Sequence, residues 1–200
     1  MTLIKSISGI RGIVNNGLNY STIEKFVFGF LQLQNSGPIL IARDGRSHGL
    51  EFSEKISKFL VSLNKTVIDC GIIPTPTAQL IVKEKQCCGG IVITASHNPA
   101  EWNGLKFIDN NGCFINPEKY EQLLYVMSKN NTPEDSTQNL GEIINYNNEA
   151  IDKHLKNIMN LSVIDVNRIK NKKYKIVIDA INSSTSKIIP MLLQKFSCKI

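Results

Sequence analysis

The 200-residue sequence predicts an α/β fold, a mixed sheet with helices on both faces, from two kinds of segment and their order. Apolar, β-branched runs typical of buried strands occupy residues 38–42, 66–70 and 89–93. Amphipathic stretches with helical spacing lie between them, at residues 50–63 and 77–85. Strands that alternate with helices are typical of a sheet with helices packed on its faces.

The composition is that of an ordinary globular chain, with 42% hydrophobic and 20% charged residues. The formal charge of +6 raises the question of an anionic partner. The basic residues are scattered, without interleaved aromatic residues, so we expect a phosphorylated small molecule and no nucleic acid. No apolar stretch reaches the roughly 18–20 residues of a membrane span. No secretory signal is recognisable, so we expect no membrane partner and a cytoplasmic location. The five scattered cysteines suit free thiols.

The amino-terminal segment predicts a short strand at residues 2–7 and a loop at residues 8–12. Gly9 and Gly12 bracket Arg11 in that loop, which would let the backbone approach a ligand closely. A guanidinium suits a phosphate, although a solvated surface arginine is the alternative. A capping box at residues 21–24 then predicts the start of a helix.

The next strand, residues 38–42, ends in the charged segment 43–46. The helix of residues 50–63 and the strand of residues 66–70 follow. Pro74 and Pro76 predict an extended loop before the short helix that leads to the central strand, residues 89–93.

The central strand breaks into the small and polar residues Thr94, Ala95, Ser96, His97, Asn98 and Pro99. Ligands of open α/β sheets bind outside the carboxyl ends of strands, so a serine at this point is well placed to present its hydroxyl. The alternative is an ordinary strand exit in which Ser and Asn satisfy local backbone groups.

After this loop the sequence predicts a turn at residues 102–104 and a strand at residues 105–108. Alternation puts Leu105 and Phe107 on one face of that strand and Lys106 on the other. Lys106 is then either a solubility device on an edge strand or an inward functional cation. A turn at 109–112 precedes a helix that begins at Pro117.

The remaining chain predicts a polar linker, residues 130–148, with a short strand near 141–145. A helix at 147–161 and a basic, solvated connection at 167–175 follow. Residues 175–200 resemble the start of a second α/β domain, with a strand at 175–179, a helix at 187–196 and the opening of another strand at 198–200. We therefore divide the chain into residues 1–146, 147–174 and 175–200.

Four segments occur in the order found in one enzyme family: SGIRG at residues 8–12, ARDGR at 42–46, PTPT at 74–77, and TASHNP at 94–99 followed by NGLK at 103–106. Together they resemble the α-D-phosphohexomutases, which include phosphoglucomutase, phosphomannomutase and phosphoglucosamine mutase. The resemblance runs through essentially the whole chain and implies the first domain of that family.

The chain departs from the family pattern in several places. His48 stands where the family often has a small hydroxyl residue, and Ser183-Ser184 replace glycine in a DAxNGxG segment. The aspartate-rich metal loop, the sugar-recognition loop and the carboxyl-terminal phosphate-binding domain do not occur. We therefore expect an amino-terminal fragment that is inactive alone.

The resemblance implies that Ser96 carries a phosphoryl group between the 1- and 6-positions of a hexose phosphate through a bisphosphate, which also serves as activator. It implies Mg²⁺ bound in part through the phosphate on Ser96. It further implies that Arg11 and Lys106 flank the phosphoserine, Arg11 for electrostatics and Lys106 as a possible base. His97 would orient or contact the phosphate, and Thr94 and Asn98 would belong to the phosphate loop.

Two other functions stay open on the sequence. One is a non-catalytic module that binds a sugar phosphate. The other is a serine hydrolase, which would need a base and an orienting acid around Ser96. Glucosamine, glucose and mannose phosphates are all candidate substrates, and the resemblance slightly favours glucosamine 6-phosphate.

Overall fold

The structure, a computed structural model, describes residues 3–129 and 140–200. Its strands are β1 Ile4–Ser6, β2 Gly9–Val14, β3 Gly17–Leu18, β4 Ile39–Arg43, β5 Val67–Ile72, β6 Gly89–Ile93, β7 Trp102–Asp109 and β8 Ile143–Asn145. Its helices are α1 Tyr20–Gln32, α2 Gly49–Ser62, α3 Thr75–Glu84, α4 Pro117–Lys129, α5 Asn147–Met159, α6 Val166–Lys172 and α7 Ile188–Lys195. The strands form a mixed sheet in the order β1-β2-β7-β6-β4-β5-β8, with β3 beside β2.

The sheet has a reversal of strand order at its centre. Strands β5 and β6 both pair in parallel with β4, one on each side, and β7 pairs antiparallel with β6. The carboxyl ends of β4 and β6 therefore lie next to each other, beside the amino end of β7. Ligands of α/β sheets bind at such a reversal, so this edge is where a site is expected.

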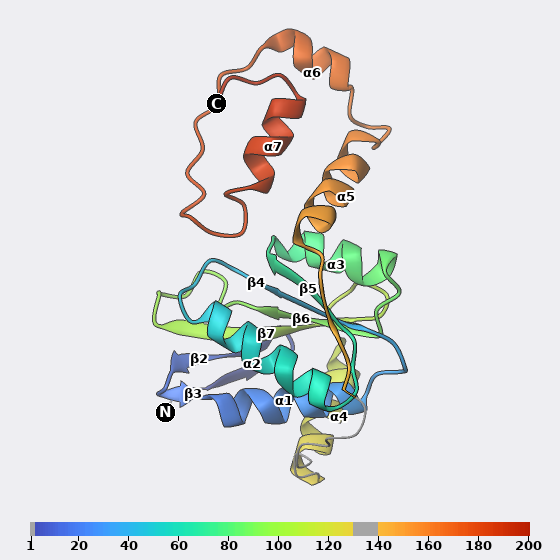
Figure 1. Cartoon of the computed structure of the whole chain (residues 1–200). Helices are drawn as coiled ribbons and strands as arrows, with labels where there is room; N and C mark the ends of the chain where they lie inside the picture. Colours follow the sequence, from blue (N-terminus) through green and yellow to red (C-terminus); the bar gives the residue numbers. More distant parts are fainter. Residues whose placement is uncertain (1–2, 130–139) are drawn as a thin grey trace.

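Helices cover both faces of the sheet, as the sequence predicts (Figure 1). One core packs α1, α2 and α4 against the sheet, and its largest buried side chains include Phe26, Phe30 and Phe107. The second core packs α3 and α5 on the opposite face, around Leu40, Val92 and Ile151. The two cores hold the sheet rigid from both sides, so the loops at its edge start from fixed positions.

Two predicted loops are strands instead. Residues 9–12 lie in β2 and residues 102–104 lie in β7, and the two strands pair with Arg11 opposite Gly104. Gly104 serves close backbone approach here rather than turning, and Gly9, which has a φ of 109° directly after the tight turn between β1 and β2, serves both. A Cβ on Gly104 would lie 2.1 Å from the Ile10 carbonyl oxygen, and one on Gly9 would lie 1.9 Å from that of Leu105. Both predictions of irregular structure were therefore wrong.

Two helix starts also differ from the prediction. The helix α1 is capped by Asn19, whose Oδ1 accepts from the Thr22 backbone N–H at 2.9 Å, and not by the capping box at residues 21–24. The helix α3 starts at Thr75 after an extended Pro74, so Pro76 lies within its first turn. Proline suits that turn because its missing N–H has no helical acceptor there.

The carboxyl-terminal segment contains the predicted helices α5 and α7, and β8 confirms the predicted short strand near residues 141–145. The basic run forms part of the exposed helix α6. The predicted strand at 175–179 does not form. A single bridge joins Lys175 to Lys199, and Val177 is fully exposed. A strand needs neighbouring strands and a covered face, and this segment has neither among the described residues. The linker residues 130–139 lie outside the described part of the chain.

The cysteines of the described chain are free, and Cys70, Cys87 and Cys88 are buried. Burial raises the pKa of the Cys87 thiol to about 12, so it behaves as a small apolar residue, as predicted. No helix in the described ranges is both long and apolar enough to cross a bilayer.

Candidate active site

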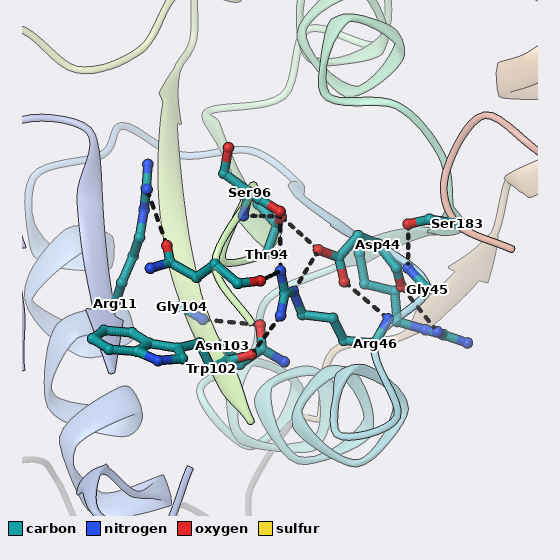
Figure 2. Close-up of polar contacts among 12 residues, drawn as sticks. Arg11, Asp44, Gly45, Arg46, Thr94, Ser96, Trp102, Asn103, Gly104 and Ser183 are labelled. Carbon is teal, nitrogen blue, oxygen red and sulfur yellow. Dashed lines mark hydrogen bonds and ion pairs between the residues drawn. The ribbon is translucent and has the colours of Figure 1, made fainter. Parts of the chain in front are cut away.

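The serine loop, residues 94–102, follows β6 at the reversal of strand order. Ser96 has a left-handed backbone with φ of 58°, which is uncommon for a residue other than glycine, asparagine or aspartate. Its side chain is exposed, and its hydroxyl has no hydrogen-bond partner in the described part of the chain. Figure 2 shows this hydroxyl turned away from the network of polar contacts behind it. A free hydroxyl on a fixed loop can act as a nucleophile.

The loop that follows the neighbouring strand β4 contacts the serine loop through Asp44. The Asp44 backbone N–H donates to the Ile93 carbonyl oxygen at 3.1 Å. The Thr94 hydroxyl donates to Asp44 Oδ2 at 2.6 Å and accepts from the Ser96 backbone N–H at 3.0 Å. Asp44 therefore holds the amino side of Ser96 through the hydroxyl of Thr94.

Arg46 holds the rest of the loop. Its Nε donates to Asp44 Oδ2 at 3.2 Å, and the two side chains are only 12% and 13% exposed. Its terminal nitrogens donate, at 2.6 to 3.0 Å, to four backbone carbonyl groups, those of Ser96, Asn98, Pro99 and Trp102. The serine loop is thus fixed by a charged pair from the loop that follows the adjacent strand β4.

Arg11 lies on the other side of the serine loop, on β2. Its Nη1 donates to Asn98 Oδ1 at 3.3 Å (Figure 2). Lys106 on β7 faces away from Leu105 and Phe107, which are buried in one core, as alternation predicts. Its Nζ lies 5.3 Å from the centre of the Phe114 ring. Burial, and secondly the nearby Arg11, lowers the pKa of Lys106, so its ammonium loses a proton more readily than usual.

The arrangement of a serine hydrolase is not found among residues 3–129 and 140–200. His97 is exposed and makes no polar contact there. The Nδ1 of His154 lies 2.7 Å from the Thr77 hydroxyl, on a different part of the molecule. No histidine contacts Ser96 as a base, so the geometry does not support that alternative.

Residues 181–183 lie opposite the serine loop and form the other wall of the candidate site. A cavity of about 230 Å³ lies between them and the serine loop, lined by Asp44, Gly45, Arg46, Ser96, Asn98, Ala100, Ile181 and Ser183. The Gly45 backbone N–H donates to Ser183 Oγ at 3.1 Å. Ser183, noted in the sequence only as a departure from the family pattern, therefore helps to close the site.

The residues that the structure describes do not by themselves make a magnesium site. Within the described ranges no three His, Cys, Asp or Glu side chains lie together in a way that could hold a metal ion. The carboxylate closest to the loop, Asp44, already accepts from Thr94 and Arg46. The predicted contribution of Ser96 through its phosphate is a single ligand, whereas Mg²⁺ prefers an octahedral set of oxygens.

Sequence reasoning missed Asp44 and Arg46 as site residues. They were recognised as charged residues at the end of a strand, but about fifty positions separate them from Ser96. The available signal was topological. Where a sheet reverses its strand order, the carboxyl ends of the two flanking parallel strands lie together. The local sequence does not show which strands are neighbours.

The comparisons of this chain with known proteins all point to one family. Residues 3–134 match the family described as phosphoglucomutase/phosphomannomutase, alpha/beta/alpha domain I. The chain is 36% identical over 196 residues to a phosphoglucosamine/phosphogalactosamine mutase of Sulfurisphaera tokodaii, and 33% identical over 202 residues to a phosphoglucosamine mutase of Prochlorococcus marinus. These alignments cover 96% and 100% of this chain, but only 42% and 43% of the relatives.

A solved structure has the same fold. The crystal structure of a putative phosphomannomutase from Thermus thermophilus aligns with 99% of this chain and 44% of its own, with a TM-score of 0.77. Its sequence is 22% identical, so this likeness concerns the fold alone. The chain therefore spans less than half the length of the relatives it matches.

Proposed function

Because this chain belongs to the phosphoglucomutase/phosphomannomutase family, we propose that it supplies the phosphoryl-carrying part of a phosphohexomutase. Ser96 accepts a phosphoryl group and returns it, which moves phosphate between the 1- and 6-positions of a hexose. The observation that carries the proposal is the exposed, unpartnered Ser96 hydroxyl on a fixed loop beside a cavity, at the carboxyl end of a buried strand. We take residues 1–146 as the first domain and residues 175–200 as the start of the second, in a cytoplasmic enzyme.

The transfer step uses this chain as follows. Ser96 Oγ attacks a phosphorus of a hexose bisphosphate, the bond from that phosphorus to the sugar oxygen breaks, and the sugar oxygen takes a proton. The hydroxyl proton of Ser96 leaves to a base. Lys106 suits that role because its pKa is lowered by burial and by Arg11. The guanidinium of Arg11 offsets the charge on the transferring group.

The reverse transfer regenerates the free serine. A hydroxyl at the other end of the sugar attacks the phosphorus on Ser96, the Oγ–phosphorus bond breaks, and Ser96 recovers its proton. We propose that His97 and Asn98, which lie on the same loop, contact the phosphate. Among the described residues, magnesium would contact this chain through a phosphate oxygen on Ser96.

We propose glucosamine phosphate as the substrate. Two of the sequence relatives are named as phosphoglucosamine mutases, one of them also as a phosphogalactosamine mutase. Another relative, from Thermococcus kodakarensis, is named as a phosphoglucomutase/phosphomannomutase and is 31% identical, so glucose and mannose phosphates belong in the same assay.

The test uses the full-length gene product that contains these residues. It is incubated with Mg²⁺ and glucosamine 1,6-bisphosphate, and the phosphorylated peptide is identified by mass spectrometry. We expect one phosphoryl group on Ser96, and none in Ser96→Ala, whose turnover is lost. Ser47→Ala, a second exposed serine at the same edge of the sheet, is the matched control and should behave as the wild type.

Two results would reject the proposal. One is a Ser96→Ala enzyme that still interconverts the hexose phosphates at the wild-type rate. The other is a wild-type protein that gains no phosphate and isomerises none of the three hexose phosphates, as a non-catalytic binding module would behave. Labelling of Ser96 by a phosphonate probe would instead support a serine hydrolase.

A further inference from the structure

The guanidinium of Arg46 has no N–H group left for a ligand. A guanidinium carries five N–H groups, one on Nε and two on each terminal nitrogen. Nε donates to Asp44 Oδ2, Nη1 donates to two backbone carbonyl oxygens, and Nη2 donates to two more. The number of acceptors at each nitrogen equals its number of hydrogens. Arg46 therefore lies beside the reacting serine with all of its donors in use.

Arg11 differs in this respect. In the described part of the chain it makes one side-chain hydrogen bond, from Nη1 to Asn98 Oδ1 at 3.3 Å. Its remaining N–H groups are available to a phosphate. Of the two arginines that contact the serine loop, only Arg11 can bind the transferred group without first breaking bonds that hold the protein together.

The pair of Asp44 and Arg46 holds the backbone of Ser96 from both sides. The Ser96 N–H donates to the Thr94 hydroxyl, which in turn donates to Asp44. The Ser96 carbonyl oxygen accepts from Arg46 at 2.9 Å. The residue between these two anchors has the left-handed φ of 58°, which L-residues with a Cβ seldom adopt.

We propose that Arg46 is a positioning residue for phosphoryl transfer and not a phosphate ligand. With Asp44 it keeps Ser96 in the left-handed conformation, and that conformation presents the hydroxyl to the cavity. The charge of Arg46 is balanced by Asp44, so the pair fixes the nucleophile without adding a further unpaired cation that would retain the phosphoryl group. The catalytic part of this proposal rests on the proposed function, whereas the conformational part does not.

The experiment compares Arg46→Lys with Arg11→Lys in the full-length gene product. Lysine keeps the charge but has only three donors on one nitrogen, so it cannot span Asp44 and four carbonyl oxygens. For Arg46→Lys we expect kcat to fall about 100-fold with KM for the hexose phosphate unchanged, because a small misplacement of the nucleophile costs about that much. For Arg11→Lys we expect KM to rise.

A second readout needs no activity. Hydrogen exchange is measured in peptides that cover the serine loop, with the unphosphorylated protein. Arg46→Lys should speed exchange at residues 96–102 and leave the buried strands β4 and β6 unchanged, whereas Arg11→Lys should leave the whole loop at the wild-type rate. If the wild type proves to have no mutase activity, the proposed function fails, and the exchange data still decide whether Arg46 holds the loop.

Three results would overturn the positioning role. In the first, the KM of Arg46→Lys rises while its kcat and its hydrogen exchange stay at wild-type values. In the second, none of these quantities changes. In the third, kcat falls although hydrogen exchange in the serine loop is unchanged. If Arg46→Lys does not fold, Thr94→Val decides, because it removes the hydroxyl between Ser96 and Asp44 but keeps the side-chain shape. We expect Thr94→Val to slow turnover and loosen the loop, and Thr94→Ser to restore both. Wild-type behaviour of Thr94→Val would refute the proposal.

Discussion

The serine loop and the loop of residues 180–186 face each other across one cavity, but they are anchored differently. The serine loop is held by backbone hydrogen bonds to β7 and β2 and by the Asp44–Arg46 pair that follows β4. Residues 180–186 contact the sheet domain through one hydrogen bond among the described residues, from the Gly45 N–H to Ser183 Oγ. Their other hydrogen bonds are internal or local, such as that from the Ile181 N–H to Asp179 Oδ1.

This difference separates two requirements of the proposed phosphoryl-carrier site. A nucleophile must be held close to its reacting geometry. The free-energy cost of ordering it there is incurred when the protein folds and not during the reaction. The opposite wall must admit and release a sugar, which a weakly anchored loop allows. Ile181 on that wall is 81% exposed with a left-handed φ of 45°, so it packs little against its surroundings. The serine loop is thus the fixed side of the cavity, and residues 180–186 are the weakly anchored side.

Lys106→Met is expected to have the largest effect of the three changes. If Lys106 accepts the proton of Ser96, its loss should lower turnover by about 100-fold or more. Methionine preserves most of the apolar stem, so the packing against Phe114 should survive. Steady-state rates of the full-length gene product measure this, with Lys83→Met on the nearby helix α3 as the control. Wild-type turnover in Lys106→Met would remove Lys106 from the mechanism.

The same variant has a pH-dependent effect on stability whose sign follows from the lowered pKa. Burial, with Arg11 as the second cause, makes the folded protein release the Lys106 proton at a lower pH than the unfolded chain does. The cost of the buried charge is present in full below the folded pKa and disappears as pH rises toward the ordinary lysine value. Lys106→Met should therefore raise the melting temperature most at neutral pH, and its advantage should shrink in alkaline buffer. An advantage that grows with pH would contradict the direction of the shift.

Much of the fold could be predicted from the sequence because it depends on local patterns. The buried strands β4, β5 and β6 and the helices between them follow from apolar runs and helical spacing. The errors arose because glycine occurs both in turns and where two backbones approach closely. Gly104 indicated a turn, but it serves the close approach of β2 to β7, which depends on a partner about ninety residues away. Gly9 serves the same approach and also follows the tight turn between β1 and β2. The strand predicted at 175–179 failed for a related reason. Its residues have the apolar pattern of a strand, but in the described chain the segment pairs with another segment only through the bridge from Lys175 to Lys199.

The sequence was enough to propose the nucleophile of the candidate site, but not to find the residues that support it. Ser96 could be found because a polar loop follows a buried strand and because its motif resembles a family. The roles of Asp44 and Arg46 depend on which strands are neighbours and on where five N–H groups point, and neither is visible in a linear sequence. Ser183 was missed because its contact with Gly45 joins segments 138 residues apart.

Gly45→Ala should break the contact between the two sides. An added Cβ would lie 2.6 Å from the Asn182 carbonyl oxygen and 2.8 Å from the Ser183 Cα. One side must move, and the weakly anchored residues 180–186 are expected to give way, so the cost should be about 1 kcal/mol, the low end for overpacking. Hydrogen exchange should quicken at residues 180–186 and stay unchanged in the serine loop. Faster exchange in the serine loop instead would reverse the comparison.

Ser183→Ala is the smallest change and isolates the single hydrogen bond. The Gly45 amide loses its acceptor but lies at an exposed position where water can replace it, so the cost should be about 0.5 kcal/mol, seen as faster exchange of that amide. In a Gly45→Ala background the bond is already broken by displacement, so adding Ser183→Ala should cost nothing more. The two changes are then non-additive, as expected for residues in direct contact. Additive costs would mean that residues 180–186 keep their position when Cβ is added, and that the cavity has two fixed walls rather than one.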